Sequence, residues 1–362
     1  MRARAAAVLL LAALFGLPLQ AAPAPPQRPE DTEFKDEIDV RLSTIVLRVV
    51  DDHGEPIRGL TPRDFRVRIG RREVPVVAVD WIAAGEPAPA PPERPAASGA
   101  LPVPSPPPDT SSAGSPSPPG RLVVVFVQAD NNSSVRIRGH LKTLPYARKL
   151  LDALAPEDRV AVVSFDSHLK LWRDFTTDRD AAYAGIDRAI RFGALPDPIE
   201  PGEPPSLARA FDAERALDIA APEWGLEATA TALKPIAGEK ILIFLGWGLG
   251  RFGGGTTMTP GFAPAVRALA RAHTSVFVLD VTDADAHDLA VGLEAVAEET
   301  GGTYAKTNEL PDVAVRELLR TISGYYVLTL DPDRLPAGKR GELRIDLRER
   351  RGTVLVRSAR VR

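Results

Sequence analysis

The feature that most constrains this chain is the alternation, from residue 122 onwards, of short apolar runs with segments of helical spacing. Residues 122–127, 160–165 and 241–245 are runs of five or six mostly apolar residues, as in strands that are covered on both faces. Between the first two, residues 139–154 carry leucines at the spacing of an amphipathic helix. This alternation predicts an α/β fold, with a doubly wound, mostly parallel sheet over residues 121–323.

Three further elements are predicted inside this region. Residues 169–175 follow the second buried run after a three-residue turn, so we expect an edge strand in a hairpin. Ser206 has the side chain of a helix cap, and we expect a helix from there to residue 220. Residues 285–299 are expected to form another helix, which ends at two glycines.

The regions on either side of residues 121–323 have strand periodicity. Residues 37–82 and 324–362 contain short segments in which apolar and polar residues alternate. Each region is too small to bury a core alone, so we expect the two to pair into one β layer beside the α/β domain. Residues 83–120 hold 13 prolines in 38 positions and are predicted to be an extended spacer. The alternative for this stretch is a ligand of domains with aromatic grooves.

The N-terminus has the pattern of a secretory signal. Arg2 and Arg4 precede an apolar run of about 15 residues, which is short for a membrane span, and small residues follow at Ala21 and Ala22. We therefore expect a signal peptide over 1–22, a disordered lead-in over 23–36 and no transmembrane segment in the mature chain. The protein is then extracytoplasmic, either periplasmic or secreted. An uncleaved membrane anchor is the alternative.

Composition excludes several kinds of chemistry. The chain has no cysteine, which removes disulfides, thiolate metal sites and cysteine nucleophiles. Its five histidines are scattered without the spacing of metal ligands, so we expect no catalytic residues. The net charge of −3 gives no general attraction to nucleic acid, and the basic residues of 334–362 are interpreted as the solvated face of a strand.

Three groups of segments resemble one known family. They are residues 49–61 with 64–67, residues 158–165 with 174–178, and residues 238–245 with 323–328. In these segments the chain resembles bacterial extracytoplasmic proteins with a von Willebrand factor A-related domain, a family of Acidobacteria type. The resemblance implies a von Willebrand factor A-type, Rossmann-like domain, and it says little about function because the family is defined by its architecture.

The resemblance also implies where a metal site would lie. Domains of this type often hold a cation at the carboxyl ends of their strands, through an Asp-x-Ser-x-Ser motif, a threonine and a second aspartate. Here the first strand leads into residues 128–134, so either Gln128 takes the first position and the carboxylate is lost, or Asp130, Asn132 and Ser134 form a degenerate motif. Trp247 stands where the second aspartate is expected, and Ser206 is the nearest hydroxyl to the threonine position.

We therefore expect no cofactor and no metal ion, with Mg²⁺ or Ca²⁺ at Asp130, Asn132 and Ser134 as the alternative. The candidate partner-binding residues are Trp247, Asp130, Asn132, Ser134 and Ser206. Trp247 lies in a glycine-rich loop at the binding rim, where an aromatic side chain is either a recognition anchor or packed on its own domain. The other interpretation of Asp130 and its neighbours is a turn and cap before the next helix.

Residues 248–253 match the G-x-G-x-x-G pattern of dinucleotide-binding loops, but no helix is expected to begin within the glycines.

The leading hypothesis for the function is a non-enzymatic binding module that recognises a protein or glycan at the cell envelope. The alternative is a structural or assembly component of the envelope. The third hypothesis is a nucleotide-binding enzyme that uses residues 248–253.

Overall fold

The computed structural model describes residues 44–84, 120–129, 133–194, 198–252, 256–335, 341–357 and 360–361. The predicted signal peptide, the lead-in, residues 85–119 of the predicted spacer, and the candidate residues Asp130 and Asn132 lie outside the described residues. Among the described helices, none is long and apolar enough to span a membrane.

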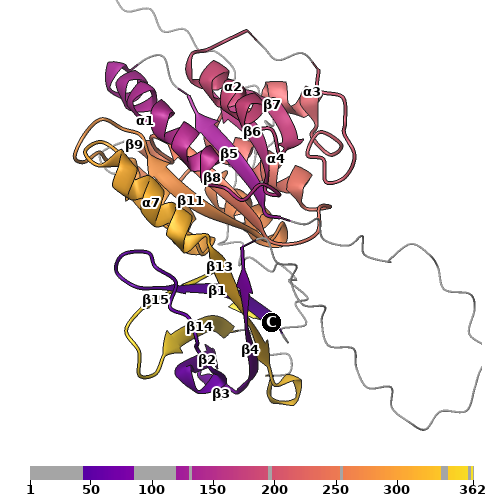
Figure 1. Cartoon of the computed structure of the whole chain (residues 1–362), viewed down its shortest axis with the longest axis vertical. Coiled ribbons are helices and arrows are strands. Elements are labelled where there is room, and N and C mark those ends of the chain that lie inside the picture. Colours follow the sequence, from indigo (N-terminus) through magenta and orange to yellow (C-terminus); the bar gives the residue numbers. More distant parts are fainter. Residues whose placement is uncertain are drawn as a thin grey trace, which may run out of the picture. The chain divides into compact units, whose positions relative to one another are not determined.

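The central element is a six-stranded sheet with the order β12-β11-β8-β5-β6-β7 (Figure 1). Neighbouring strands are parallel except at β7, which forms an antiparallel hairpin with β6, as predicted. The strand order reverses between β5 and β8, where doubly wound sheets place their ligand sites. The bounds are β5 (Leu122–Gln128), β6 (Arg159–Phe165), β7 (Leu169–Thr176), β8 (Lys240–Gly246), β11 (Thr274–Asp280) and β12 (Tyr304–Lys306).

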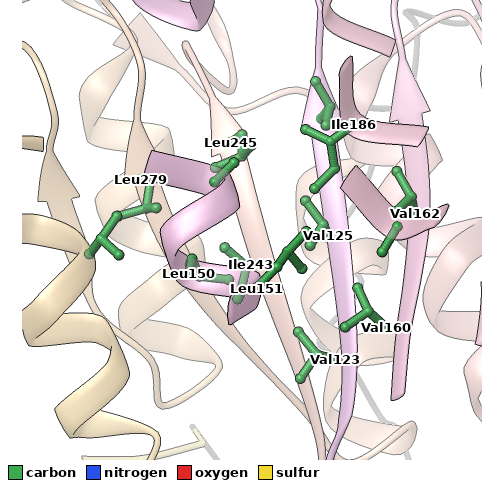
Figure 2. Packing of buried hydrophobic residues seen from close by; sticks show 14 of the residues in the cluster. Val123, Val125, Leu150, Leu151, Val160, Val162, Ile186, Ile243, Leu245 and Leu279 are labelled. Carbon is green, nitrogen blue, oxygen red and sulfur yellow. The ribbon is translucent and has the colours of Figure 1, made fainter. Parts of the chain in front are cut away.

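Helices cover both faces of this sheet, which confirms the predicted fold class. One face is packed by α1 (Ser134–Asp152), α2 (Arg179–Ile190) and α7 (Pro311–Thr321). Figure 2 shows Leu150 and Leu151 of α1 against Val125 and Ile243 of the sheet. The other face is packed by α3 (Ala213–Asp218), α4 (Pro222–Leu233), α5 (Phe262–Arg271) and α6 (Ala290–Glu299).

The N- and C-terminal strands pair with each other, as predicted, but in two sheets instead of one layer. Their orders are β15-β1-β13-β4 and β16-β14-β2-β3. Leu47, Phe65 and Tyr326 come from both sheets and lie in one shared core, because a single layer would leave its apolar face in water. The strands are β1 (Thr44–Val50), β2 (Phe65–Ile69), β3 (Arg72–Val74), β4 (Val76–Ala83), β13 (Gly324–Leu330), β14 (Gly341–Leu347), β15 (Thr353–Val356) and β16 (Arg360–Val361). Two single 3₁₀ turns are η1 (Pro62–Asp64) and η2 (Pro332–Arg334).

Two of the predicted helices are shorter than expected. The helix expected over 206–220 is only α3, which Asp212 caps by accepting a hydrogen bond from the Arg215 N–H. Ser206 instead donates its hydroxyl to Asp174 of β7 at 2.5 Å. The helix expected over 285–299 begins at Ala290, because the preceding residues form a loop in which His287 bonds to a strand residue. In both places a hydrogen bond to a strand residue is found where the first helical turn was predicted.

Candidate functional site

The carboxyl edge of the sheet is closed by the side chain of Gln128, the last residue of β5, which is fully buried. Its Oε1 accepts the backbone N–H groups of Trp247 at 3.0 Å and Gly248 at 3.2 Å. Its Nε2 donates to the carbonyl oxygen of Gly248 at 2.7 Å. The amide therefore joins the ends of β5 and β8, and its oxygen already faces two hydrogen-bond donors. An oxygen in that setting is a poor ligand for a cation, since the N–H groups occupy the directions a metal would take.

Trp247 follows β8 directly and lies half-buried at this edge. Its ring packs against the core of the α1, α2 and α7 face, and the guanidinium of Arg136 lies 3.4 Å from the ring centroid. Arg136 comes from the first turns of α1, so the stack joins the helix to the loop after β8. The indole Nε1 is buried and has no hydrogen-bond partner among the described residues. The packing of the ring supports the interpretation of Trp247 as a residue packed on its own domain. The indole N–H without a hydrogen-bond partner among the described residues supports its interpretation as a recognition anchor.

The glycine-rich loop after Trp247 forms a small hairpin in place of a helix. Its strands are β9 (Arg251–Phe252) and β10 (Thr256–Thr257), and the next helix, α5, begins at Phe262. In the described part of the motif, residues 248–252, no helix N-terminus lies at the glycines as it does in loops that bind a pyrophosphate.

A buried glutamate holds the hairpin in place. Glu223, in the first turn of α4, accepts the Gly250 N–H at 2.8 Å, and its other carboxylate oxygen has no partner among the described residues. On the other side, the Thr256 hydroxyl donates to the Asp288 carbonyl oxygen at 2.6 Å. The hairpin is therefore fixed to the N-terminal end of α4 and to the loop before α6.

Three large apolar side chains are exposed around this hairpin. Trp224 is 39% exposed, Phe252 is 64% exposed and Met258 is 38% exposed. Trp224 follows Glu223 in the chain, while Phe252 and Met258 belong to the hairpin and the segment after it. We call Trp247, Arg136, Trp224, Phe252 and Met258 the rim surface. Aromatic residues, methionine and arginine are the residue types enriched in the cores of protein interfaces.

Sequence reasoning missed a hydrogen-bonded cluster at the same edge. Asp280, the last residue of β11, is buried and accepts hydrogen bonds from His287 Nε2 and the Tyr304 hydroxyl, both at 2.7 Å. Burial opposes ionisation of Asp280, but these bonds and the Thr282 N–H hold the pKa of its carboxyl below the usual value. Burial and Asp280 together raise the pKa of the Tyr304 hydroxyl. An acid that ends an apolar run, seven residues before a histidine, was the only signal in the sequence.

The predicted site residues are not all brought together. Ser134 is the first residue of α1 and is exposed near the rim surface. Ser206 binds Asp174, which lies in the half of β7 that pairs with the beginning of β6, so Ser206 is not at the carboxyl edge. Within the described ranges, no group of three or more His, Asp or Glu side chains is placed to hold a metal ion.

No protein-family model and no curated protein sequence matches the chain. Among solved structures, an aerotolerance-related membrane protein from Bacteroides fragilis is 12% identical and covers 56% of this chain and 98% of its own, with a TM-score of 0.37. The von Willebrand factor domain of the type V pilus tip protein Mfa5 from Porphyromonas gingivalis is 14% identical and covers 56% and 95%, with a TM-score of 0.35. The PilB minor pilin from Streptococcus sanguinis is 13% identical and covers 55% and 60%, with a TM-score of 0.35.

At these identities and scores, the assignment of the fold rests on the sheet itself. Six strands in the order given above, with a single antiparallel strand at one edge, make a von Willebrand factor A-like α/β fold. The narrower resemblance to an Acidobacteria-type family stays a prediction.

Proposed function

We propose that this protein is an exported, non-enzymatic binding module whose rim surface recognises a partner at the cell envelope without a metal ion. The observation that carries the proposal is the set of three hydrogen bonds between Gln128 and the loop at Trp247 and Gly248. In the register that puts Gln128 at the first position of the metal motif, these bonds engage the residue that stands in place of the first carboxylate. The bonds hold the carboxyl edge of the sheet in one conformation, so that side chains, without a metal ion, contact the partner.

The residue types of the rim surface favour a protein over a glycan. Trp247 carries Arg136 on its ring, and tryptophan and arginine are the commonest hot-spot residues of protein interfaces. The pair is preorganised, because Arg136 stacks on the ring and Gln128 holds the backbone N–H of Trp247 before any partner arrives. Glycan recognition remains the other outcome of the test below.

Export is supported by the charged and apolar pattern of residues 1–22, and the absence of cysteine is compatible with any redox compartment.

The non-enzymatic assignment is supported by the hydrogen bonds of the acidic residues at the carboxyl edge. The Asp280 carboxylate, a buried acid at this edge, is engaged by His287 and Tyr304. Neither partner is bonded to a serine or threonine hydroxyl that could act as a nucleophile in the described part of the chain.

The test is affinity capture from envelope extract with the purified full chain, followed by titration of the captured species. Trp247→Ala should weaken binding about ten-fold or more, since it removes the aromatic side chain on which Arg136 stacks. Val77→Ala is the matched control, because Val77 is an exposed apolar residue of β4. EDTA should leave the affinity unchanged.

Three results would count against the proposal. Equal capture by wild type and Trp247→Ala would place recognition elsewhere, and loss of binding in EDTA would restore a metal-dependent mechanism. A failure of the full chain to enrich any species over the control would favour the structural or assembly role.

A further inference from the structure

Among the described strands, β12 is the last strand of the central sheet and is paired on one side alone, with β11, so its outer edge has no neighbouring strand. The Val278 N–H donates to the Thr303 carbonyl oxygen at 2.8 Å, and the Thr307 N–H donates to the Asp280 carbonyl oxygen at 3.0 Å. Because backbone groups alternate in direction along a strand, those of Tyr304 and Lys306 point away from β11. Within the described residues, no hydrogen bond is made to the backbone groups of these two residues.

A cavity of about 240 Å³ runs beside this edge. Its floor is apolar and includes Leu279, Ala314 and Leu318, and its walls come from β12, α7, β15 and the turn after β1. Pockets for whole small molecules usually measure about 300–1,000 Å³. The cavity is therefore of the size expected for one or two side chains of a longer ligand.

The charged residues that line this cavity are all acidic: Asp51, Asp52 and Glu317. Asp51 accepts the N–H groups of His53 at 2.8 Å and Glu55 at 2.9 Å, which lowers the pKa of its carboxyl and keeps it ionised at neutral pH. No ion pair neutralises Asp52 or Glu317 in the described part of the chain.

The basic side chains closest in sequence to these walls are already engaged. Arg320 pairs with Glu55 at 2.9 Å. Lys306 extends from β12 and donates its ammonium to the Asp285 carbonyl oxygen. The cavity therefore presents a negative wall, an apolar floor and an open backbone edge side by side.

We propose that the β12 edge binds an extended, basic peptide segment of a partner protein, which adds to the sheet as a further strand. The backbone of the peptide pairs with Tyr304 and Lys306, an apolar side chain enters the cavity, and a lysine or arginine faces Asp52 and Glu317. This is strand addition to an exposed edge, with pockets for alternate side chains. A polyamine or a small cationic molecule would meet the acids but leave the backbone edge unused. The site is separate from the rim surface and does not depend on the function proposed for it.

The test uses fluorescein-labelled heptapeptides and the purified full chain. The probe has the sequence Thr-Val-Thr-Lys-Thr-Val-Thr, and its twins carry glutamate in place of lysine or N-methyl groups on alternate backbone amides. Because β12 is short, we expect a dissociation constant on the order of 10–100 µM for the lysine peptide by fluorescence anisotropy. The glutamate twin should bind at least about five-fold more weakly, and the N-methylated twin should not bind measurably.

A charge-reversal variant distinguishes binding at this site from general electrostatic attraction between the peptide and the protein. Glu317→Arg should reverse the preference, so that the glutamate peptide binds more tightly than the lysine peptide. Glu298→Arg is the control, because Glu298 is an exposed glutamate of α6, on the other face of the sheet, and it should leave the preference unchanged. Hydrogen exchange followed by NMR should show new protection at the amides of Tyr304 and Lys306 in the complex.

Each opposite result overturns the proposal. Absence of binding by every peptide at millimolar concentration would show that the edge is closed. Equal affinity for the lysine and glutamate peptides would show that the acidic residues of the cavity do not contribute to peptide binding. Equal effects of Glu317→Arg and Glu298→Arg would show the same. Retained binding by the N-methylated twin would show that the cavity takes a cation without strand addition.

Discussion

At the scale of single residues, Gln128 decides what the carboxyl edge can do. A neutral amide can both donate and accept, and Gln128 does both toward the same loop. A carboxylate at this position would accept the two N–H groups but would place its other oxygen against the Gly248 carbonyl oxygen. If Gln128 takes the first position of the metal motif, an amide in place of the carboxylate gives a structural bond between β5 and the loop after β8.

Gln128→Glu tests this role directly. At neutral pH the buried carboxylate faces the Gly248 carbonyl oxygen, so we expect the free energy of unfolding to fall by about 2–4 kcal/mol. Burial raises the pKa of the introduced carboxyl, so the loss should grow as pH rises above about 4.3, the usual glutamate pKa, and should shrink below it. Urea denaturation at about pH 4 and pH 7 measures both effects.

Gln128→Met is the control, because it removes the same hydrogen bonds without adding a charge and should give a pH-independent loss. A variant Gln128→Glu that is as stable as wild type, and that magnesium stabilises further, would mean that this edge still accepts a cation.

At the scale of elements, the sheet was predictable and the loops were not. Buried parallel strands must be apolar on both faces, so β5, β6 and β8 stand out as unbroken runs and their predicted bounds are correct within one residue. The helices expected from Ser206 and Asp285 begin later than predicted, because Asp174 of β7 bonds to Ser206 and Asp280 of β11 bonds to His287. A local pattern carries no information about such partners.

The candidate site was predictable only in part. Trp247 was placed at the rim because it follows an apolar run at the expected edge, and the structure puts it there. The stacking of Arg136 on Trp247 and the bond from Glu223 to the hairpin join segments that are far apart in sequence. Nothing in the spacing of these residues indicates that they meet.

The terminal β sheets and the central α/β sheet are joined through a largely buried ion pair. Arg357, after β15, donates to both carboxylate oxygens of Glu239 at 2.6 and 2.9 Å, and its backbone bridges to Thr300. Arg48 of β1 is also buried beside this pair, with its guanidinium 5.2 Å from the Phe277 ring centroid. Arg357 and His273 hold the pKa of the Glu239 carboxyl well below its usual value, against the effect of burial.

We expect Arg357→Met to destabilise the protein by about 2–4 kcal/mol at neutral pH, since it leaves the Glu239 carboxylate buried without its main partner. The double variant Arg357→Met with Glu239→Gln should recover part of this loss. Because the Glu239 pKa is lowered in the folded state, the contribution of the pair is present above about pH 4.3 and lost as pH falls further. Urea unfolding of the four proteins in a double-mutant cycle provides the measurement, and strict additivity would show that the pair does not join the layers.

At the scale of the whole molecule, the residues that stabilise the fold differ from those that we propose bind partners. The two terminal β sheets are built from strands of both ends of the described chain, and the central sheet is covered on both faces. Among the described residues, the rim surface and the outer edge of β12 are two places at the margins of this framework. Both offer side chains and backbone groups for recognition, and we propose that neither needs a resident ion.

The remaining prediction concerns cations and the full chain. A divalent ion must exchange tightly held water for protein oxygens, and strong sites use several carboxylates to do so. Here the Gln128 oxygen accepts two N–H groups, and Asp130 is the one carboxylate that the sequence offers between residues 128 and 134. The resemblance also puts Trp247 where a second acid is expected. We therefore expect calorimetric titration with magnesium, manganese or calcium to show no saturable binding tighter than about millimolar. Thermal melts should coincide with and without EDTA. A micromolar site that Asp130→Ala abolishes would show instead that Asp130, Asn132 and Ser134 bind an ion despite Trp247, and recognition at the rim would then be metal-dependent.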